Sequence, residues 1–188
     1  MRFVFSERKA AQAAAQLLPM HKGHSMELYR LLKLLYLADR KSLVDTGHTI
    51  TGDKMVSMRA GPLPSNIYDA IKDSATPGSS PRVWSDYVGR GKGHLVFLNV
   101  DKPEADELSP YEIGVLAEIH SKHGDYGFSE FRDFTHEFPE WHDPGNSSSP
   151  IDPGEILRSA GIDEEQIEEI AALAEEECRL AEILGKPA

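Results

Sequence analysis

The pair His136-Glu137 comes nearest to a catalytic motif, because His-Glu opens the HExxH pattern of zinc hydrolases. In that pattern a second histidine follows one helical turn later, and both histidines bind the metal. Here the fifth position is Glu140, and Pro139 ends any helix before it, because proline has no N–H for the next hydrogen bond. The spacing therefore excludes the zinc geometry.

Two other histidines and the single cysteine give no stronger catalytic signal. His120 and His123 lie three apart on an expected helix and could share a metal, but spacing fixes no third ligand. Cys178 stands among glutamates, whose charge disfavours the reactive thiolate. A lone cysteine also excludes an internal disulfide framework and fits a reducing compartment. We therefore expect no catalytic residue, no metal ligand and no cofactor.

Two glycine-rich stretches are candidates for holding a phosphate. GRGKG, residues 89–93, lacks the spacing and the hydroxyl residue of a P-loop and is expected to join two strands. RAGPLPS, residues 59–65, precedes an expected helix, but no Lys-Ser or Lys-Thr pair follows it. Gly61 permits a close backbone approach, and Pro62 fixes φ. The second stretch is therefore expected to be a rigid turn and not a ligand loop.

Asp39 is a polar residue that the helical pattern places inward. It continues the apolar face of Leu32 and Leu35 on a long expected helix. A buried carboxylate without donors costs roughly 1–3 kcal/mol, so donors must lie close to it. The candidates are Arg59 and the free N–H groups of the helix that follows 59–65, whose dipole favours an anion. We predict that Asp39 clamps this turn onto the central helix.

Local signals predict a mainly α fold with a small antiparallel β-sheet, in which a compact helical domain surrounds the central apolar helix. Capping residues and helix breakers place helices at 7–18, 26–46, 65–73, 110–123, 130–138, 152–161 and 163–184. Ser25 is the expected cap of the second of these. Strands are expected at 54–59 and, as a hairpin, at 82–88 and 94–100.

The charge distribution narrows the range of partners. The net charge is −11, and residues 163–188 hold nine acidic side chains against Arg179 and Lys186, a net charge of −7. Such a field disfavours nucleic acid and anionic membranes and favours a basic partner, although a solvated helix face is the plainer interpretation. No apolar run approaches the roughly 20 residues of a membrane helix, and no signal peptide opens the chain. We expect a cytoplasmic protein.

The stretch HDPGNSSSP, residues 142–150, is rich in turn formers and is typical of a linker. We therefore divide the chain into a main domain at 1–143 and a linker with a C-terminal acidic helical extension at 144–188. On the last expected helix a narrow stripe of mostly small residues, able to pack on another helix, follows helical spacing. Its members are Ile167, Ile170, Ala171, Ala174, Cys178, Ala181 and Leu184.

Three segments, taken in order, resemble the Panacea domain family, also called SocA-like antitoxins. They are LLKLLYLADRKSLVDTGHTITGD, MVSMRAGPLPSNIYDAI and LSPYEIGVLAEIHSKHGDYGFSEFRDFTHEFPEW. The resemblance spans roughly residues 6–143 and leaves the tail unmatched. Its most specific pieces are KLLYLAD at 33–39, Thr51-Gly52-Asp53, Gly61-Pro62, and Thr135-His136 with Pro139 and Trp141. The residues expected to form the shared structural motif are Asp39, Gly52, Asp53, Arg59, Gly61, Pro62 and Trp141.

The resemblance implies a mostly helical domain with a small β element that neutralises a protein toxin encoded beside it. Family members pair with toxins of unrelated folds, the SocA branch delivers its toxin to a Clp protease, and other relatives come from phage-associated genes. The expected partner is therefore a cognate toxin. A proteolytic adaptor and, from another class, a small hydrolase or metal-dependent enzyme are the alternatives. A homo-oligomer stays open, and the sequence does not define the toxin-binding residues.

Overall fold

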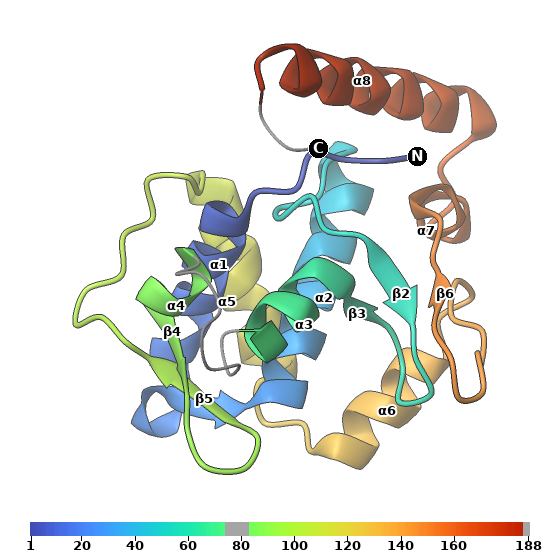
Figure 1. Cartoon of the computed structure of the whole chain (residues 1–188). Helices are drawn as coiled ribbons and strands as arrows, with labels where there is room; N and C mark the ends of the chain where they lie inside the picture. Colours follow the sequence, from blue (N-terminus) through green and yellow to red (C-terminus); the bar gives the residue numbers. More distant parts are fainter. Residues whose placement is uncertain (74–82, 186–188) are drawn as a thin grey trace.

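Helices make up most of the structure, a computed structural model that describes residues 1–73 and 83–185 (Figure 1). The central helix is α2, and the other helices are arranged around it. In chain order the helices are α1 (Glu7–Met20), the short 3₁₀ turn η1 (Lys22–His24), α2 (Leu28–Thr46), α3 (Ser65–Asp73), α4 (Val83–Tyr87), α5 (Pro110–His123), α6 (Phe128–His136), α7 (Pro153–Ser159) and α8 (Glu164–Ile183).

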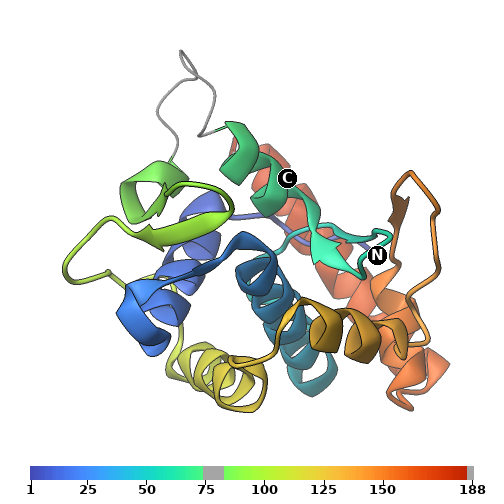
Figure 2. The same cartoon turned by 90° about the horizontal axis from the view of Figure 1, so that it is seen from below.

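Helix α2 is apolar nearly all round, so it can be buried on every side. From Leu31 to Asp39 its residues are at most 4% exposed. It packs against α1, α5, α6 and α7, and Figure 2 shows α5 and α6 on either side of it. The helix ends at Gly47, which has a left-handed φ of 77° and donates its N–H to the Leu43 carbonyl at 2.9 Å. The predicted central helix is confirmed.

Capping residues define several helix starts, as expected from local sequence. The Ser6 hydroxyl accepts the Lys9 N–H at the start of α1. At α5 the Ser109 hydroxyl accepts the Glu112 N–H, and the Glu112 carboxylate accepts the Ser109 N–H, which completes a capping box. These bonds satisfy N–H groups that a helix leaves free at its first turn.

Two small antiparallel sheets complete the fold, which is therefore mainly α with a small β component. In one sheet β5 (Leu95–Leu98) lies between β1 (Ser25–Glu27) and β4 (Val88–Arg90). In the other β2 (Met55–Ser57) lies between β3 (Leu63–Pro64) and β6 (Ser149–Pro150). Both central strands thus pair with segments distant in sequence.

Three sequence-based expectations need correction. Ser25 does not cap α2: it pairs with Phe97, and the helix begins only at Leu28. Within the expected strand 82–88, residues Val83–Tyr87 form α4, and residue 82 lies outside the described residues. The expected linker 142–150 contains β6, whose pairing with β2 fixes it to the domain. Each error concerns a segment whose conformation depends on a distant partner and not on local propensity.

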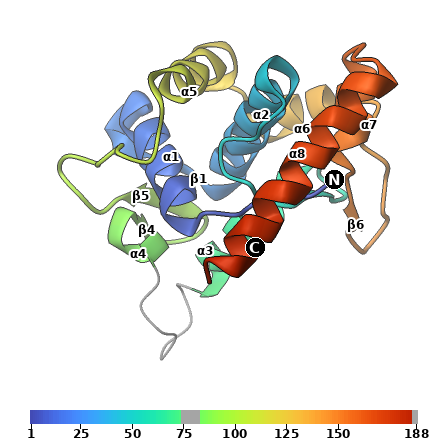
Figure 3. The ribbon, with the colours of Figure 1, turned by 90° about the horizontal axis from the view of Figure 1, so that it is seen from above.

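The C-terminal helices lie against the rest of the chain. Helix α7 packs on α2, and α8 passes over the N-terminal segment (Figure 3). The Cys178 thiol lies 3.5 Å from the Arg2 carbonyl, and the Ile170 side chain fills the space beside Gly47. Of the expected apolar stripe, Ile167, Ala174, Cys178 and Ala181 are buried, whereas Leu184 is 72% exposed. The buried stripe therefore contacts the N-terminal segment.

Candidate binding surface around the central helix

Asp39 holds the loop between α2 and β2. Its carboxylate is fully buried and accepts the N–H groups of Ile50 and Thr51, at 2.8 and 2.9 Å, and the Thr51 hydroxyl. Burial raises the pKa of Asp39 to about 7, although these three hydrogen bonds favour the ionised form. The predicted inward position of Asp39 is confirmed.

The predicted partners of Asp39 are wrong. The anion at the start of α3 is Asp53, whose carboxylate accepts the N–H groups of Asn66 and Ile67 at 2.9 and 2.8 Å. Asp53 lies closer to the helix start because the chain reverses through β2 and β3, which brings the segment before β2 next to the first residues of α3: the Ser65 N–H donates to the Lys54 carbonyl at 2.8 Å. Burial raises the pKa of Asp53 to about 6, against the effect of these N–H groups. Arg59 is exposed to solvent.

Lys33 is the residue that ties the 59–65 turn to α2. Its ammonium group donates to the Pro62 carbonyl at 2.6 Å, and the side chain is 1% exposed. Gly61 lies against the same group: a Cβ built there would come within 2.7 Å of Lys33 Nζ, and φ is 96°. Burial lowers the pKa of Lys33 to about 7. Sequence reasoning missed this role, although a single lysine within an apolar helix was a usable signal.

Trp141 fixes the chain after α6 to the turn before Gly61. Its indole N–H donates to the Met58 carbonyl at 3.0 Å, and its ring stacks on His136 with centroids 3.6 Å apart. The His136 ring is therefore used in packing against Trp141. The expected structural role of Trp141 fits this arrangement.

A second buried polar cluster joins α2 to the turn after α6. The Glu140 carboxylate accepts the Tyr36 hydroxyl at 2.9 Å and the Arg40 Nε at 2.6 Å, and its side chain is fully buried. Burial tends to raise the pKa of Glu140, but the hydrogen bond and charge of Arg40 outweigh it and lower the pKa. This cluster was missed because its partners are a hundred residues apart in sequence.

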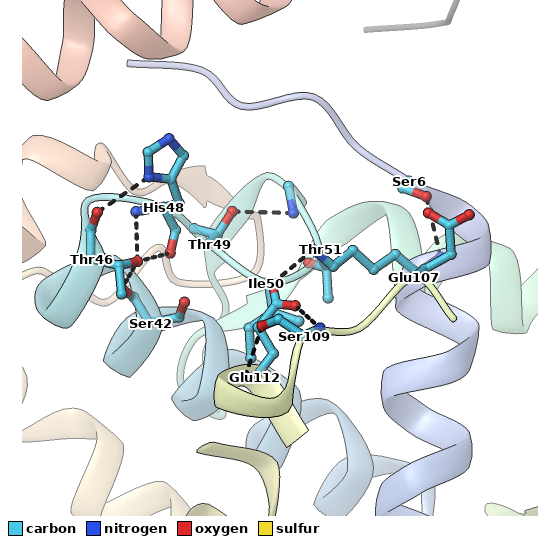
Figure 4. Close-up of polar contacts among 12 residues, drawn as sticks. Ser6, Ser42, Thr46, His48, Thr49, Ile50, Thr51, Glu107, Ser109 and Glu112 are labelled. Carbon is cyan, nitrogen blue, oxygen red and sulfur yellow. Dashed lines mark hydrogen bonds and ion pairs between the residues drawn. The ribbon is translucent and has the colours of Figure 1, made fainter. Parts of the chain in front are cut away.

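The loop after α2 is held by short-range polar contacts, which Figure 4 shows. The Thr46 hydroxyl donates to the Ser42 carbonyl at 2.8 Å, and the Thr49 hydroxyl accepts the Gly52 N–H at 3.1 Å. Gly52 has a φ of 72°, and a Cβ there would overlap the Val4 carbonyl. A cavity of about 340 Å³ beside this loop is lined by the ion pair Lys9–Glu112, at 2.7 Å, and by His48 and Glu177, whose side chains lie 3.4 Å apart.

An apolar groove of about 620 Å³ lies beside the 59–61 turn. The rings of Tyr29 and Phe128 form one wall, with centroids 4.6 Å apart, and the Tyr29 hydroxyl donates to the Ala60 carbonyl. Tyr68 also lines the groove, and Phe128 is 50% exposed. A concave surface with aromatic walls suits an apolar side chain of a bound molecule.

The candidate catalytic residues of the sequence are used in packing. The His123 ring stacks on Phe134 with centroids 4.8 Å apart, and the His120 ring packs edge-on against His21. Burial lowers the pKa of both His120 and His123. Within the part of the chain that the structure describes, no group of three or more His, Cys, Asp or Glu residues has the geometry of a metal site.

Comparison with known families identifies the scaffold. A family model described as antitoxin SocA-like, Panacea domain, matches residues 31–142, more than half of the chain. The chain belongs to this family. The match is shorter than the expected span of 6–143, since α1 lies outside it. No curated protein and no solved structure gives a significant match.

The matched residues, here called the Panacea segment, contain both buried polar clusters and the 59–65 turn. Helices α7 and α8 lie beyond it. In residues 1–73 and 83–185, none of the helices has the length and apolar character that a membrane span requires. The Panacea segment thus contains most of the buried central helix and the polar contacts that join it to the rest of the fold.

Proposed function

We propose that this protein is an antitoxin that neutralises a cognate protein toxin, encoded beside it, by binding the toxin directly in the cytoplasm. The observation that carries the proposal is the match of residues 31–142 to the antitoxin SocA-like family. Binding and not catalysis is the proposed mode of action.

The use of polar residues inside the Panacea segment supports a binding role. Asp39, Asp53 and Glu140 each accept hydrogen bonds that fix one segment of the chain to another. Lys33 does the same as a donor. Since these groups hold the scaffold, we assign toxin contacts to exposed side chains that the scaffold presents in a fixed arrangement. A preorganised surface loses little conformational entropy on binding.

Growth rescue tests the proposal. The gene adjacent to the one for this chain is expressed alone and together with it, and colony formation is counted. We expect the neighbour to stop growth and co-expression to restore it, with a complex that co-purifies. A harmless neighbour, or a toxic neighbour that this protein neither binds nor neutralises, would contradict the proposal.

A titration separates binding from catalysis. Purified antitoxin is added in steps to a fixed amount of toxin, and residual toxin activity is measured. A binder is expected to reach full neutralisation only at a stoichiometric ratio, because each molecule occupies one toxin site. Full neutralisation at a small fraction of that ratio would indicate an enzyme instead.

The adaptor mechanism, in which the toxin is delivered to a Clp protease, makes a different prediction. In a host without the protease, rescue by direct binding should persist, since occupation of the toxin suffices. Loss of rescue in that host, with the complex still formed, would replace direct neutralisation by delivery for degradation.

A further inference from the structure

Helix α8 presents two apolar rows on different faces. The inner row is buried against the N-terminal segment, as described above. The outer row faces solvent: Leu173 is 54% exposed, Leu180 52% and Leu184 72%. Steps of seven and four residues place these three leucines along one line of the helix. Ile183, 74% exposed, lies next to this row. Exposed aliphatic side chains that gather on one face of a helix are typical of an interaction surface.

Acidic side chains border the outer row. Glu169 and Glu176 lie four residues before and three residues after Leu173, which places both beside it. Neither has an ion-pair partner in residues 1–73 and 83–185, and the same holds for Glu165, Glu168 and Glu175. The ion pairs of α8 with Arg158 and Arg2 are made by Glu164 and Glu182, and Glu177 contacts His48. The unpaired charges therefore belong to the open surface.

We propose that the outer face of α8, the row Leu173, Leu180 and Leu184 with its acidic border, docks the toxin through an apolar patch ringed by lysine or arginine. This inference rests on the proposed function and specifies its contact surface. Apolar burial would supply affinity, and opposite charges at the border would orient the partner and speed association.

A second copy of the chain fits this face less well than a basic partner. Two α8 helices packed through their leucines would place glutamates opposite glutamates, and like charges across an interface are repulsive. The groove beside the 59–61 turn gives no comparable preference, because its lining contains both Glu27 and Arg59, of opposite charge. Charge complementarity thus favours α8 over the groove as the docking surface, and a basic protein over a second copy as the partner.

The inner face of α8 makes the contacts with the rest of the chain. Arg2 pairs with Glu182 at 3.1 Å, and His48 pairs with Glu177. The side chains of Ala174 and Cys178 are buried on the inner face of the helix. The outer leucines take no part in these contacts, so their replacement should leave the fold intact. This separation allows the surface to be tested without unfolding the protein.

The test measures binding of the purified, catalytically inactivated product of the adjacent gene to the full chain. In Leu173→Ser/Leu180→Ser we expect the dissociation constant to rise at least tenfold, while the melting temperature stays that of the unaltered chain. The matched control is Leu95→Ser/Phe97→Ser, which changes two exposed residues of β5, far from α8 (Figure 1). The control should bind as the unaltered chain does.

A charge reversal provides a second measurement. Glu169→Lys/Glu176→Lys should lower the association rate constant severalfold and weaken its salt dependence. An unchanged dissociation constant in the leucine variant overturns the inference but leaves the proposed function standing. Absence of binding by the unaltered chain overturns both. Self-association of the purified chain that the leucine variant abolishes, measured by light scattering, would assign this face to a second copy and also overturn the inference.

Discussion

Lys33 carries its charge into the centre of the protein, where the Pro62 carbonyl is its hydrogen-bond acceptor. In the described residues no carboxylate forms an ion pair with it. Burial lowers the pKa of Lys33 from 10.5 to about 7, so between these values the unfolded chain binds one more proton than the folded chain. The free energy of unfolding should therefore rise with pH over this interval, by up to about 1.4 kcal/mol per pH unit from this group.

Replacement of the lysine tests this dependence. Lys33→Met keeps the length of the side chain and removes the titrating group, so the rise between pH 7 and 10 should disappear. Urea unfolding at several pH values measures it. The control is Lys54→Met, because Lys54 is exposed and its loss should leave the slope unchanged. If the free energy of unfolding of Lys33→Met still rises between pH 7 and 10, another group must cause the rise.

Asp39 is the other residue whose removal should be costly. Asp39→Ala leaves two buried N–H groups and the Thr51 hydroxyl without their acceptor. We expect a loss of about 2–5 kcal/mol in the free energy of unfolding, measured by urea denaturation at pH 8. Asp45→Ala, on the exposed end of the same helix, should cost about 1 kcal/mol or less. Equal losses at both positions would contradict the role of Asp39 as an anchor.

The pH dependence of Asp39 has the opposite sign to that of Lys33. Its pKa is raised from 3.8 to about 7, so the folded chain binds more protons over this interval. The titration of this group therefore lowers the free energy of unfolding as the pH rises from about 4 to 7, in addition to the effect of its hydrogen bonds. Asp39→Asn keeps one acceptor oxygen but cannot titrate. It should therefore unfold with a flatter pH dependence between 4 and 7 than the unaltered chain.

At the scale of elements, the loop after α2 depends on a close approach between Gly52 and the N-terminal segment. Gly52 and Gly93 have the same φ of 72°, but only at Gly52 would a Cβ overlap a neighbour, the Val4 carbonyl. Gly93→Ala should therefore cost about 1–2 kcal/mol, the cost of the left-handed backbone alone. Gly52→Ala should cost several kcal/mol, because backbone must also move. Thermal or urea unfolding of the pair measures the difference, and similar losses would refute it.

Local sequence signals predicted most helices, and contacts between residues distant in sequence account for the errors. Ser6 and Ser109 cap helices through bonds to residues three positions away, so the sequence alone reveals them. The strand at Ser25 exists because Phe97 pairs with it, which no local signal contains. In the candidate site, helical periodicity placed Asp39 inward correctly. It could not decide whether Asp39 or Asp53 meets α3, because that depends on the path of the chain through β2 and β3.

For the whole molecule, residues 144–185 are attached at several separate places. β6 extends the sheet of β2, α7 packs on α2, and α8 covers the N-terminal segment. Removal of these residues would expose the apolar surface beneath Ile156 and Leu157, which are fully buried. We expect the truncated chain 1–143 to be strongly destabilised or to aggregate, as measured by circular dichroism and sedimentation.

A truncated chain that melts cooperatively at the temperature of the full chain would instead make residues 144–188 an independent extension. That result would also permit α8 to move away from the N-terminal segment during binding. Such a movement would uncover this segment, in which Phe3 is buried in the full chain.

The position of Cys178 allows the reactivity of its thiol to report the motion of α8. The chain has one cysteine, and its thiol is fully enclosed between α8 and the N-terminal segment. A thiol-reactive dye can modify it only while the helix is lifted, so the labelling rate measures how often that opening occurs. A partner that clamps α8 would slow labelling, whereas one that inserts beneath it would accelerate labelling. The labelling rate, followed by absorbance, would thus distinguish a partner that holds α8 in place from one that displaces it, and it needs no engineered probe.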